Sequence, residues 1–128
     1  MLTYMLLFGV KQIGLKMALT RDFKETILER ARRDAKFRRS MLLRGIALLM
    51  AGDSEDVQVG KSFIRDYINA TIGFAALSKK TLIPKESLMR MLSPSGNPSL
   101  KNLNQVTQTL LANEGVKKAD SLSVSVHG

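Results

Sequence analysis

Residues 74–113 read FAALSKKTLIPKESLMRMLSPSGNPSLKNLNQVTQTLLAN and decide the fold. Two segments with apolar residues at helical spacing, Gly73 to about Lys80 and Pro84 to Leu92, are separated by only three residues. Proline and glycine then interrupt the chain in SPSGNP, and a third segment follows a cap at Ser99 or Asn97. The pattern predicts two helices that meet at a tight turn and a third, amphipathic helix after a break.

The apolar positions of this stretch predict which side of each helix is buried. We expect Leu77 to point inward, Ser78 to lie where the two helices cross closely, and Ile83 to fill the turn. Pro84 suits the start of the second helix, because a first-turn amide has no helical partner to lose. The other inward-facing residues are Leu88, Met91 and Leu92 on the second helix and Leu100, Leu103, Val106 and Leu110 on the third.

The opposite side of the second helix carries polar and cationic side chains, which can bond to base edges and phosphates in a major groove. There Arg90 could bond to a guanine, Glu86 could accept from a cytosine amine or cap the helix, and Met89 could touch a thymine methyl. The expected DNA contacts are Lys79, Lys80, Lys85, Glu86, Ser87, Met89, Arg90, Ser93, Ser95 and Asn97.

A family resemblance rests on the spacing of Leu77, Ser78, Ile83, Leu88, Met91 and Leu92, followed by GNPSLKNL. This spacing resembles the lambda-repressor and Cro-like helix-turn-helix superfamily. Within it, LMRMLSPSGNPSLKNL looks most like the antidote proteins of bacterial addiction modules, the HigA-like antitoxins. MALTRDFKETILERARRDAKFRR and GKSFIRDYINATIGF are similar to the leading region of small bacterial regulators of this kind, so the resemblance covers about residues 17 to 115.

The resemblance implies a sequence-specific double-stranded DNA-binding protein that binds an operator as a homodimer. For an antitoxin it also implies autorepression of a type II toxin-antitoxin operon and a cognate toxin protein as partner. Two alternatives stay open, a stand-alone helix-turn-helix transcriptional regulator and a helical protein-interaction module without DNA binding. A dimer would place two recognition helices about one DNA turn apart, roughly 34 Å, over a palindromic or pseudo-palindromic operator.

Three residues depart from the family pattern. Thr81 stands where an apolar residue is usual, and Leu82 stands where the turn commonly has glycine. Phe74 replaces the usual glutamine at the start of the first helix. The phosphate contact that this glutamine makes in many relatives is therefore not carried over to this chain.

Three more helices are predicted ahead of this stretch. They span Arg21–Asp34, about Phe37–Met50 and, in its better-defined part, Lys61–Ala70. Thr20 can cap the first, Asp53 or Ser54 can cap the third, and Gly52 can end the second as a left-handed cap. The expected inward residues are Phe23, Ile27 and Ala31 on the first, Leu42, Ile46, Leu49 and Met50 on the second, and Ile64, Tyr67 and Ile68 on the third.

The expected fold class is all-α, a lambda-repressor-like helix-turn-helix bundle preceded by two amphipathic N-terminal helices. The expected parts are a leader at 1–16, an N-terminal helical pair at 17–52, a DNA-binding domain at 53–115 and a flexible tail at 116–128. Met17 opens MALTRDFKETI, which looks like a natural start, so the leader is interpreted either as an upstream extension or as a disordered segment. The terminal SLSVSVHG is short and polar, and we expect it to be frayed.

The charge of the chain indicates the chemistry of its partner. Twenty Lys and Arg against eleven Asp and Glu give a net charge of +9, which suggests a polyanion or an anionic membrane surface. The apolar stretch Tyr4–Val10 is too short for a membrane span, and no membrane partner is expected. Five Phe, two Tyr and no Trp argue against base stacking and favour duplex DNA.

Positive charge is denser ahead of the helix pair than within it. Residues 21–44 hold nine basic and four acidic residues, whereas residues 73–113 hold five and one. The segment ERARRDAKFRR (29–39) is either a second phosphate-contacting patch, which would steepen the salt dependence of binding, or a solvated helix face. In the second interpretation Glu25, Glu29 and Asp34 form i, i+4 pairs with neighbouring arginines.

Catalytic and metal sites lack their parts in this sequence. The single histidine, His127, is in the tail, cysteine is absent, and no carboxylate pair has cleft spacing, so we expect no enzyme, cofactor or metal. GDSEDVQVGKS ends like a phosphate-binding loop, but Glu55 stands where the first glycine should be and no strand precedes it. The lack of cysteine fits a reducing compartment, and the expected location is the cytoplasm.

Overall fold

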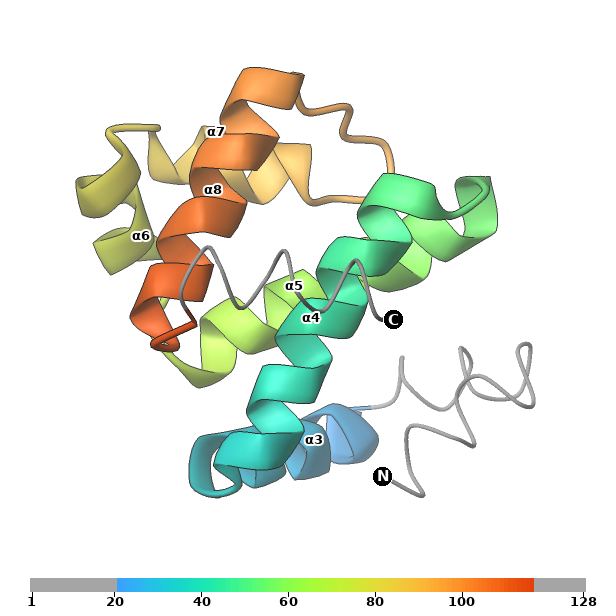
Figure 1. The fold of residues 1–128 in the computed structure, drawn as a ribbon, viewed down its shortest axis with the longest axis vertical. Coiled ribbons are helices and arrows are strands. Elements are labelled where there is room, and N and C mark those ends of the chain that lie inside the picture. The colour runs from blue at the N-terminus through green and yellow to red at the C-terminus, as the bar shows by residue number, and fades with distance from the viewer. Residues whose placement is uncertain (1–20, 117–128) are drawn as a thin grey trace. The chain divides into compact units, whose positions relative to one another are not determined.

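The computed structural model describes residues 21–116, which form six helices and no strand (Figure 1). The prediction of an all-α fold is confirmed for this part of the chain. The helices are α3 (Arg21–Arg33), α4 (Ala35–Ala51), α5 (Ser54–Ala70), α6 (Phe74–Thr81), α7 (Lys85–Met91) and α8 (Leu100–Asn113). The predicted leader, the Thr20 cap and residues 117–128 of the predicted tail lie outside the described residues. None of the described helices is long and apolar enough to cross a bilayer.

The chain divides into two compact units between Thr71 and Ile72. This boundary falls later than the one expected at residue 53, because α5 packs along α4 and against α3. The second unit therefore begins at Ile72, and α5 belongs with the two helices before it. Ser54 to Ser62, within the stretch that ends like a phosphate-binding loop, are part of α5 and form no loop, in agreement with the rejection of such a loop from the sequence.

The first unit is built on apolar stripes at helical spacing. On α3 the predicted stripe is confirmed, since Ile27 and Ala31 are buried and Phe23 is half-buried. On α5 the predicted Ile64, Tyr67 and Ile68 are all fully buried. The Asp53 cap is also confirmed, because its carboxylate accepts from the backbone N–H of Asp56 at 2.9 Å.

Two glycines allow α4 and α5 to approach closely. A Cβ added at Gly60 would lie 2.9 Å from the carbonyl oxygen of Gly45 and 3.1 Å from the backbone nitrogen of Leu49. A Cβ added at Gly45 would lie 2.9 Å from Cδ1 of Ile64 and 3.1 Å from Cβ of Phe63. The contact between the two helices therefore depends on backbone surface that only glycine exposes.

Two predictions about α4 are wrong. Met50 was expected to point inward and is 54% exposed, because the Gly45 side of the helix faces α5 and the buried residues are instead Phe37, Met41, Leu42 and Gly45. Ile46 and Leu49 are only half-buried. Gly52 ends the helix in an extended conformation (φ −85°, ψ 164°) and not a left-handed one. It is needed for space, since an added Cβ would lie 2.3 Å from Cβ of Asp56.

The first unit also buries two ionisable side chains of α5. Lys61 is 3% exposed and Asp66 is 8% exposed. Burial raises the pKa of Asp66, against the opposing attraction of Lys24 and Arg65. Burial likewise lowers the pKa of Lys61, and the nearby positive charge of Arg65 acts in the same direction. Both shifts disfavour the charged form.

The second unit consists of α6, α7 and α8, in which α6 contacts both of the other helices. Leu77, Leu88, Leu92, Val106 and Leu110 are fully buried, as predicted. The Ser99 cap is confirmed, because its hydroxyl accepts from the N–H of Asn102 at 3.1 Å.

The prediction for Leu100 is wrong. It is the first residue of α8, ahead of the turns that pack, and it is 76% exposed. The predicted Leu103 is half-buried, so burial of α8 increases from its first turn toward Val106 and Leu110. At its other end, Gly115 takes a left-handed conformation and the N–H of Val116 returns to the carbonyl of Leu111 at 2.9 Å.

Candidate nucleic-acid interface

The turn between α6 and α7 is closed by side-chain hydroxyls. Thr81 is buried, and its Oγ1 donates to the carbonyl of Leu77 at 2.8 Å and accepts from the N–H of Ile83 at 3.3 Å. The Oγ of Ser78 donates to the carbonyl of Ile83 at 2.6 Å. Ile83 itself is buried and fills the turn, as predicted. Backbone groups that the turn takes out of helical bonding are thus satisfied locally.

The third helix of the unit also holds this turn. Gln105 on α8 donates from Nε2 to the carbonyl of Thr81 at 2.6 Å. Thr81 was identified from the sequence only as a departure from an apolar position, and Gln105 was not identified at all. Both residues use polar atoms to fix the end of α6, which a search for apolar spacing does not detect.

Leu82 occupies the left-handed region of backbone space, with φ 61° and ψ 20°. It is the only residue other than glycine with positive φ among residues 21–116. Its N–H donates to the carbonyl of Ser78 at 2.8 Å, which ends α6, and its side chain is 87% exposed. The turn therefore keeps the conformation that favours glycine although leucine stands there.

The buried and exposed sides of α7 are separated at helical spacing. Leu88 and Met91 are buried, and Leu92 at the end of the helix is fully buried, as predicted. Lys85, Glu86, Met89 and Arg90 are exposed, and Ser87 is half-buried. The spacing of the four exposed residues places them on one side of the helix. Pro84 precedes the helix as its cap, with φ −54°.

The segment after α7 folds back onto the end of the helix. Ser93 donates from Oγ to the carbonyl of Arg90 at 2.6 Å, and the N–H of Gly96 donates to the carbonyl of Ser93 at 2.9 Å. A Cβ at Gly96 would lie 2.1 Å from the Arg90 carbonyl oxygen, so only glycine fits. Ser93 thus closes the helix end, whereas Ser95 and Asn97 are exposed.

The ten predicted DNA contacts all fall in the second unit. Eight of them are exposed, and Ser87 and Ser93 are half-buried. Lys79 and Lys80 lie in the last turn of α6, where positive charge also complements the helix dipole. The exposed residues among the ten include four cations and one carboxylate, that of Glu86. This surface is suited to an anionic partner.

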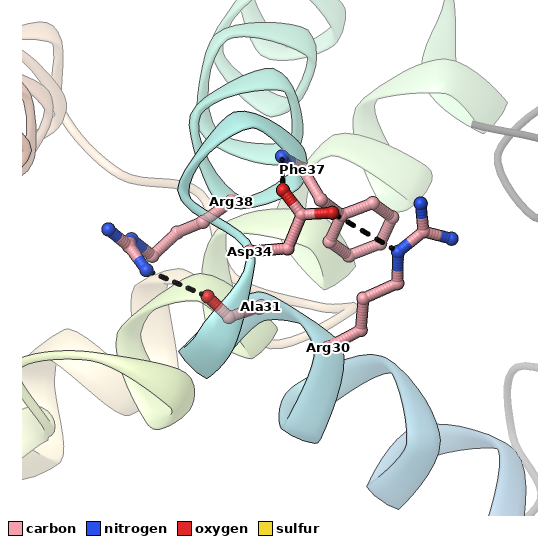
Figure 2. A network of polar contacts seen from close by, with 5 residues as sticks. All are labelled: Arg30, Ala31, Asp34, Phe37 and Arg38. Carbon is pink, nitrogen blue, oxygen red and sulfur yellow. Dashed lines mark hydrogen bonds and ion pairs between the residues drawn. The ribbon is translucent and has the colours of Figure 1, made fainter.

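A second basic region lies where α3 meets α4 in the first unit. Asp34 is the only residue between these helices, and its Oδ1 accepts from the N–H of Phe37 at 3.0 Å. That hydrogen bond is the main cause that lowers the pKa of the Asp34 carboxyl; desolvation opposes it, and the charge of Arg30 lowers the pKa further. Figure 2 shows Asp34 between Arg30 and the start of α4.

Two arginines build this junction. The Nε of Arg30 lies 3.7 Å from Oδ2 of Asp34, and its guanidinium lies 4.5 Å from the centre of the Phe37 ring. Arg38 reaches back from α4, and its Nη1 donates to the carbonyl of Ala31 at 3.0 Å (Figure 2). The same nitrogen donates to the carbonyl of Arg32 at 3.3 Å. Arg38 therefore satisfies carbonyl groups that the end of α3 leaves without helical partners.

Comparison of the chain with models of known families, with curated proteins and with solved structures found no match. Within the described part of the chain, no group of three or more His, Cys, Asp or Glu side chains is arranged to hold a metal ion. The candidate site therefore rests on the geometry of α6, α7 and the turn between them.

Proposed function

We propose that α6, the turn at Leu82 to Pro84 and α7 form a helix-turn-helix that binds double-stranded DNA sequence-specifically. The observation that carries this proposal is the exposed side of α7, where Lys85, Glu86, Met89 and Arg90 project from a helix whose other side is buried. A short helix with cations, a carboxylate and a thioether on one side matches the donors, acceptors and methyl groups of a major groove.

The polar closure of the turn supports the same proposal. Ser78 and Gln105 donate hydrogen bonds to backbone carbonyls of the turn, and Thr81 accepts one from the N–H of Ile83, so the turn between α6 and α7 is held in place. A fixed helix presents its side chains with little further loss of conformational entropy on binding. In this arrangement Arg90 and Glu86 read bases, Met89 contacts a thymine methyl, and Lys79 and Lys80 contact phosphates.

Selection of bound duplexes from a random-sequence library tests this function. The full chain should enrich one motif, and Arg90→Ala should reduce the preference for that motif over random duplex by about 1 to 3 kcal/mol. Lys79→Ala is the matched control, because loss of a phosphate contact weakens binding to all sequences alike. Equal losses on selected and random duplex for Arg90→Ala would exclude its role in base reading.

The resemblance to HigA-like antitoxins supports a narrower form of the proposal. In that form the chain is a lambda-repressor-like bundle that binds its own operator as a homodimer and also binds a cognate toxin. Footprinting should then show two protected half-sites about one DNA turn apart, roughly 34 Å. Co-expression with the product of the neighbouring gene should yield a stable complex.

Two other results would contradict the antitoxin assignment and support one of the alternative functions. Operator binding without any complex would indicate a stand-alone transcriptional regulator. A complex with a protein partner, together with no motif enrichment at moderate salt, would indicate a protein-interaction module that has the helices without DNA binding. The DNA-binding measurements, taken together with the co-expression, distinguish these two results from the narrower form.

A further inference from the structure

The junction between α3 and α4 concentrates positive charge. Residues 30–39 contain six basic residues and one acidic residue, Asp34. Two of these residues hold the junction together. Arg30 contacts Asp34 and Phe37, and Arg38 donates to the carbonyls at the end of α3. The charge of Asp34 is thus offset by Arg30, and four further cations lie in the same range.

Those four cations are Arg32, Arg33, Lys36 and Arg39, and all are exposed. Arg33 lies 3.7 Å from Glu29, as expected for an i, i+4 pair, but both side chains are about two-thirds exposed or more, at 74% and 68%. An ion pair between such exposed groups contributes little and does not remove the charge from solvent. Two of the predicted helical ion pairs are thus confirmed, that of Arg33 with Glu29 and that of Arg30 with Asp34.

The backbone that carries these cations is held firmly. The two helices are joined by one residue, the N–H of Asp34 donates to the Arg30 carbonyl at 2.9 Å, and the N–H of Arg38 donates to the Asp34 carbonyl at 2.9 Å. The last turn of α3 and the first turn of α4 are therefore fixed next to one another. Cations carried on a fixed backbone bind an extended anion with less loss of entropy than those of a flexible basic tail.

The surroundings of the four cations indicate which anion fits. Phe37, the only aromatic residue between 30 and 39, is buried beneath Arg30, and none of the large exposed apolar residues of the described chain lies in this range. The surface thus offers no ring for stacking on single-stranded bases and no apolar side chain for insertion into a bilayer. Guanidinium groups suit the phosphates of a duplex backbone.

We propose that Arg32, Arg33, Lys36 and Arg39 form a second, sequence-independent binding surface for the phosphate backbone of duplex DNA, located on the first unit. The choice of DNA as the polyanion rests on the proposed function of α7. The surface itself requires no base reading. It contributes affinity and salt dependence without contributing to the choice of sequence.

The test is a salt titration of full-length chain binding to random-sequence duplex DNA. The variant is Arg32→Gln/Lys36→Gln, in which two exposed side chains lose their charge and the junction contacts of Arg30 and Arg38 are retained. The matched control is Arg44→Gln/Lys101→Gln, which removes the same charge from exposed positions elsewhere. Circular dichroism confirms that both proteins are folded.

The junction variant should lower the slope of log affinity against log salt by about 2 and weaken binding on the order of ten-fold at low salt. The control should leave the slope nearly unchanged, and the preference of the junction variant for the selected motif should equal that of the wild type. Equal salt slopes for the junction variant and the control would overturn the proposal of a second DNA-binding surface.

Two further arms separate this surface from the role of α7. Random-duplex binding that depends on the junction but shows no motif enrichment would retain the surface and reject the proposed function. Binding of the wild type to vesicles containing phosphatidylserine, with no binding to duplex at low salt, would overturn the surface as a DNA contact. A lost motif preference in Arg90→Ala concerns α7 alone.

Discussion

The two units fix their helices by different means. In the first, α4 and α5 approach until the backbone at Gly45 lies against Gly60, so the contact depends on the absence of side chains. In the second, Ser78, Thr81 and Gln105 close the turn through hydrogen bonds to backbone atoms. The stability of the first unit should therefore be sensitive to added side-chain volume, and that of the second to the loss of polar atoms.

The largest expected effect is that of Gly60→Ala in the first unit. Its added Cβ would meet a backbone carbonyl, which cannot move without shifting α4, and we expect a loss of about 2 kcal/mol in the free energy of unfolding. Gly45→Ala is the matched control. Its closest contact is the end of the Ile64 side chain, which can move, so its loss should be smaller, while the better helix propensity of alanine favours both variants by about 1 kcal/mol. Urea unfolding followed by circular dichroism measures both, and equal stability of the two variants would contradict the close approach at Gly60.

Thr81→Val in the second unit tests the polar closure of the turn. The change keeps the shape of the side chain but leaves the buried N–H of Ile83 without its acceptor, and we expect a loss of about 1 to 2 kcal/mol. Thr109→Val removes a hydroxyl that bonds only to the preceding helical turn, at 2.8 Å, and should cost less than about 0.5 kcal/mol. The family pattern, with an apolar residue at position 81, predicts the opposite order. Urea unfolding of the two variants therefore decides whether position 81 needs a hydroxyl, as the hydrogen bonds indicate, or accepts an apolar side chain, as the family pattern predicts.

Leu82→Gly should stabilise the chain. The left-handed backbone at this position costs leucine about 1 kcal/mol more than glycine, and a net gain of about 0.5 to 1 kcal/mol is expected. Leu82→Ala keeps the strained backbone and removes only the exposed side chain, so it should change stability little. A gain from alanine equal to that from glycine would show that the exposed apolar side chain, and not the backbone, is the source of the cost.

Asp66→Asn should change how the free energy of unfolding depends on pH. Because burial raises the folded-state pKa of Asp66, the folded chain holds this proton more strongly than the unfolded chain does. Stability from this group is therefore fully present below the ordinary value of 3.8 and is lost as pH rises through the folded value. Asp66→Asn should remove that loss and make the chain more stable than wild type at neutral pH, with the difference shrinking as pH falls.

Asp34→Asn gives the opposite sign and serves as the control. The pKa of Asp34 is lowered in the folded chain, so its contribution is present at neutral pH and disappears as pH falls through the folded value. Thermal unfolding of both variants, from neutral pH to below the ordinary carboxyl pKa of 3.8, measures the two effects. A parallel pH dependence for Asp66→Asn and wild type would contradict a raised pKa of Asp66 in the folded chain.

Much of the fold could be predicted from the sequence because its signals are local. Helical spacing located Leu77, Leu88 and Leu92, and the capping residues Asp53 and Ser99 marked where two helices begin. The exposed side of α7 was predicted for the same reason, since burial of one side of a helix fixes the other. These features each depend on residues within a few positions of one another.

The missed features depend on contacts between distant residues or on a helix without a polar side. The second half of α4 is apolar all round, so its spacing could not decide whether Met50 or Gly45 faces α5. The Gly45 and Gly60 contact and the hydrogen bond from Gln105 to Thr81 join residues far apart in the chain. No local sequence pattern predicts either of these two contacts.

The single residue between α3 and α4 has a consequence for chain length. Inserting one residue beside Asp34 would turn every side chain of α4 by about 100° relative to α3. Arg38 would then leave the carbonyls of Ala31 and Arg32, and Phe37 would leave the guanidinium of Arg30. Related chains that share this junction should therefore vary in side chains there while keeping the number of residues constant.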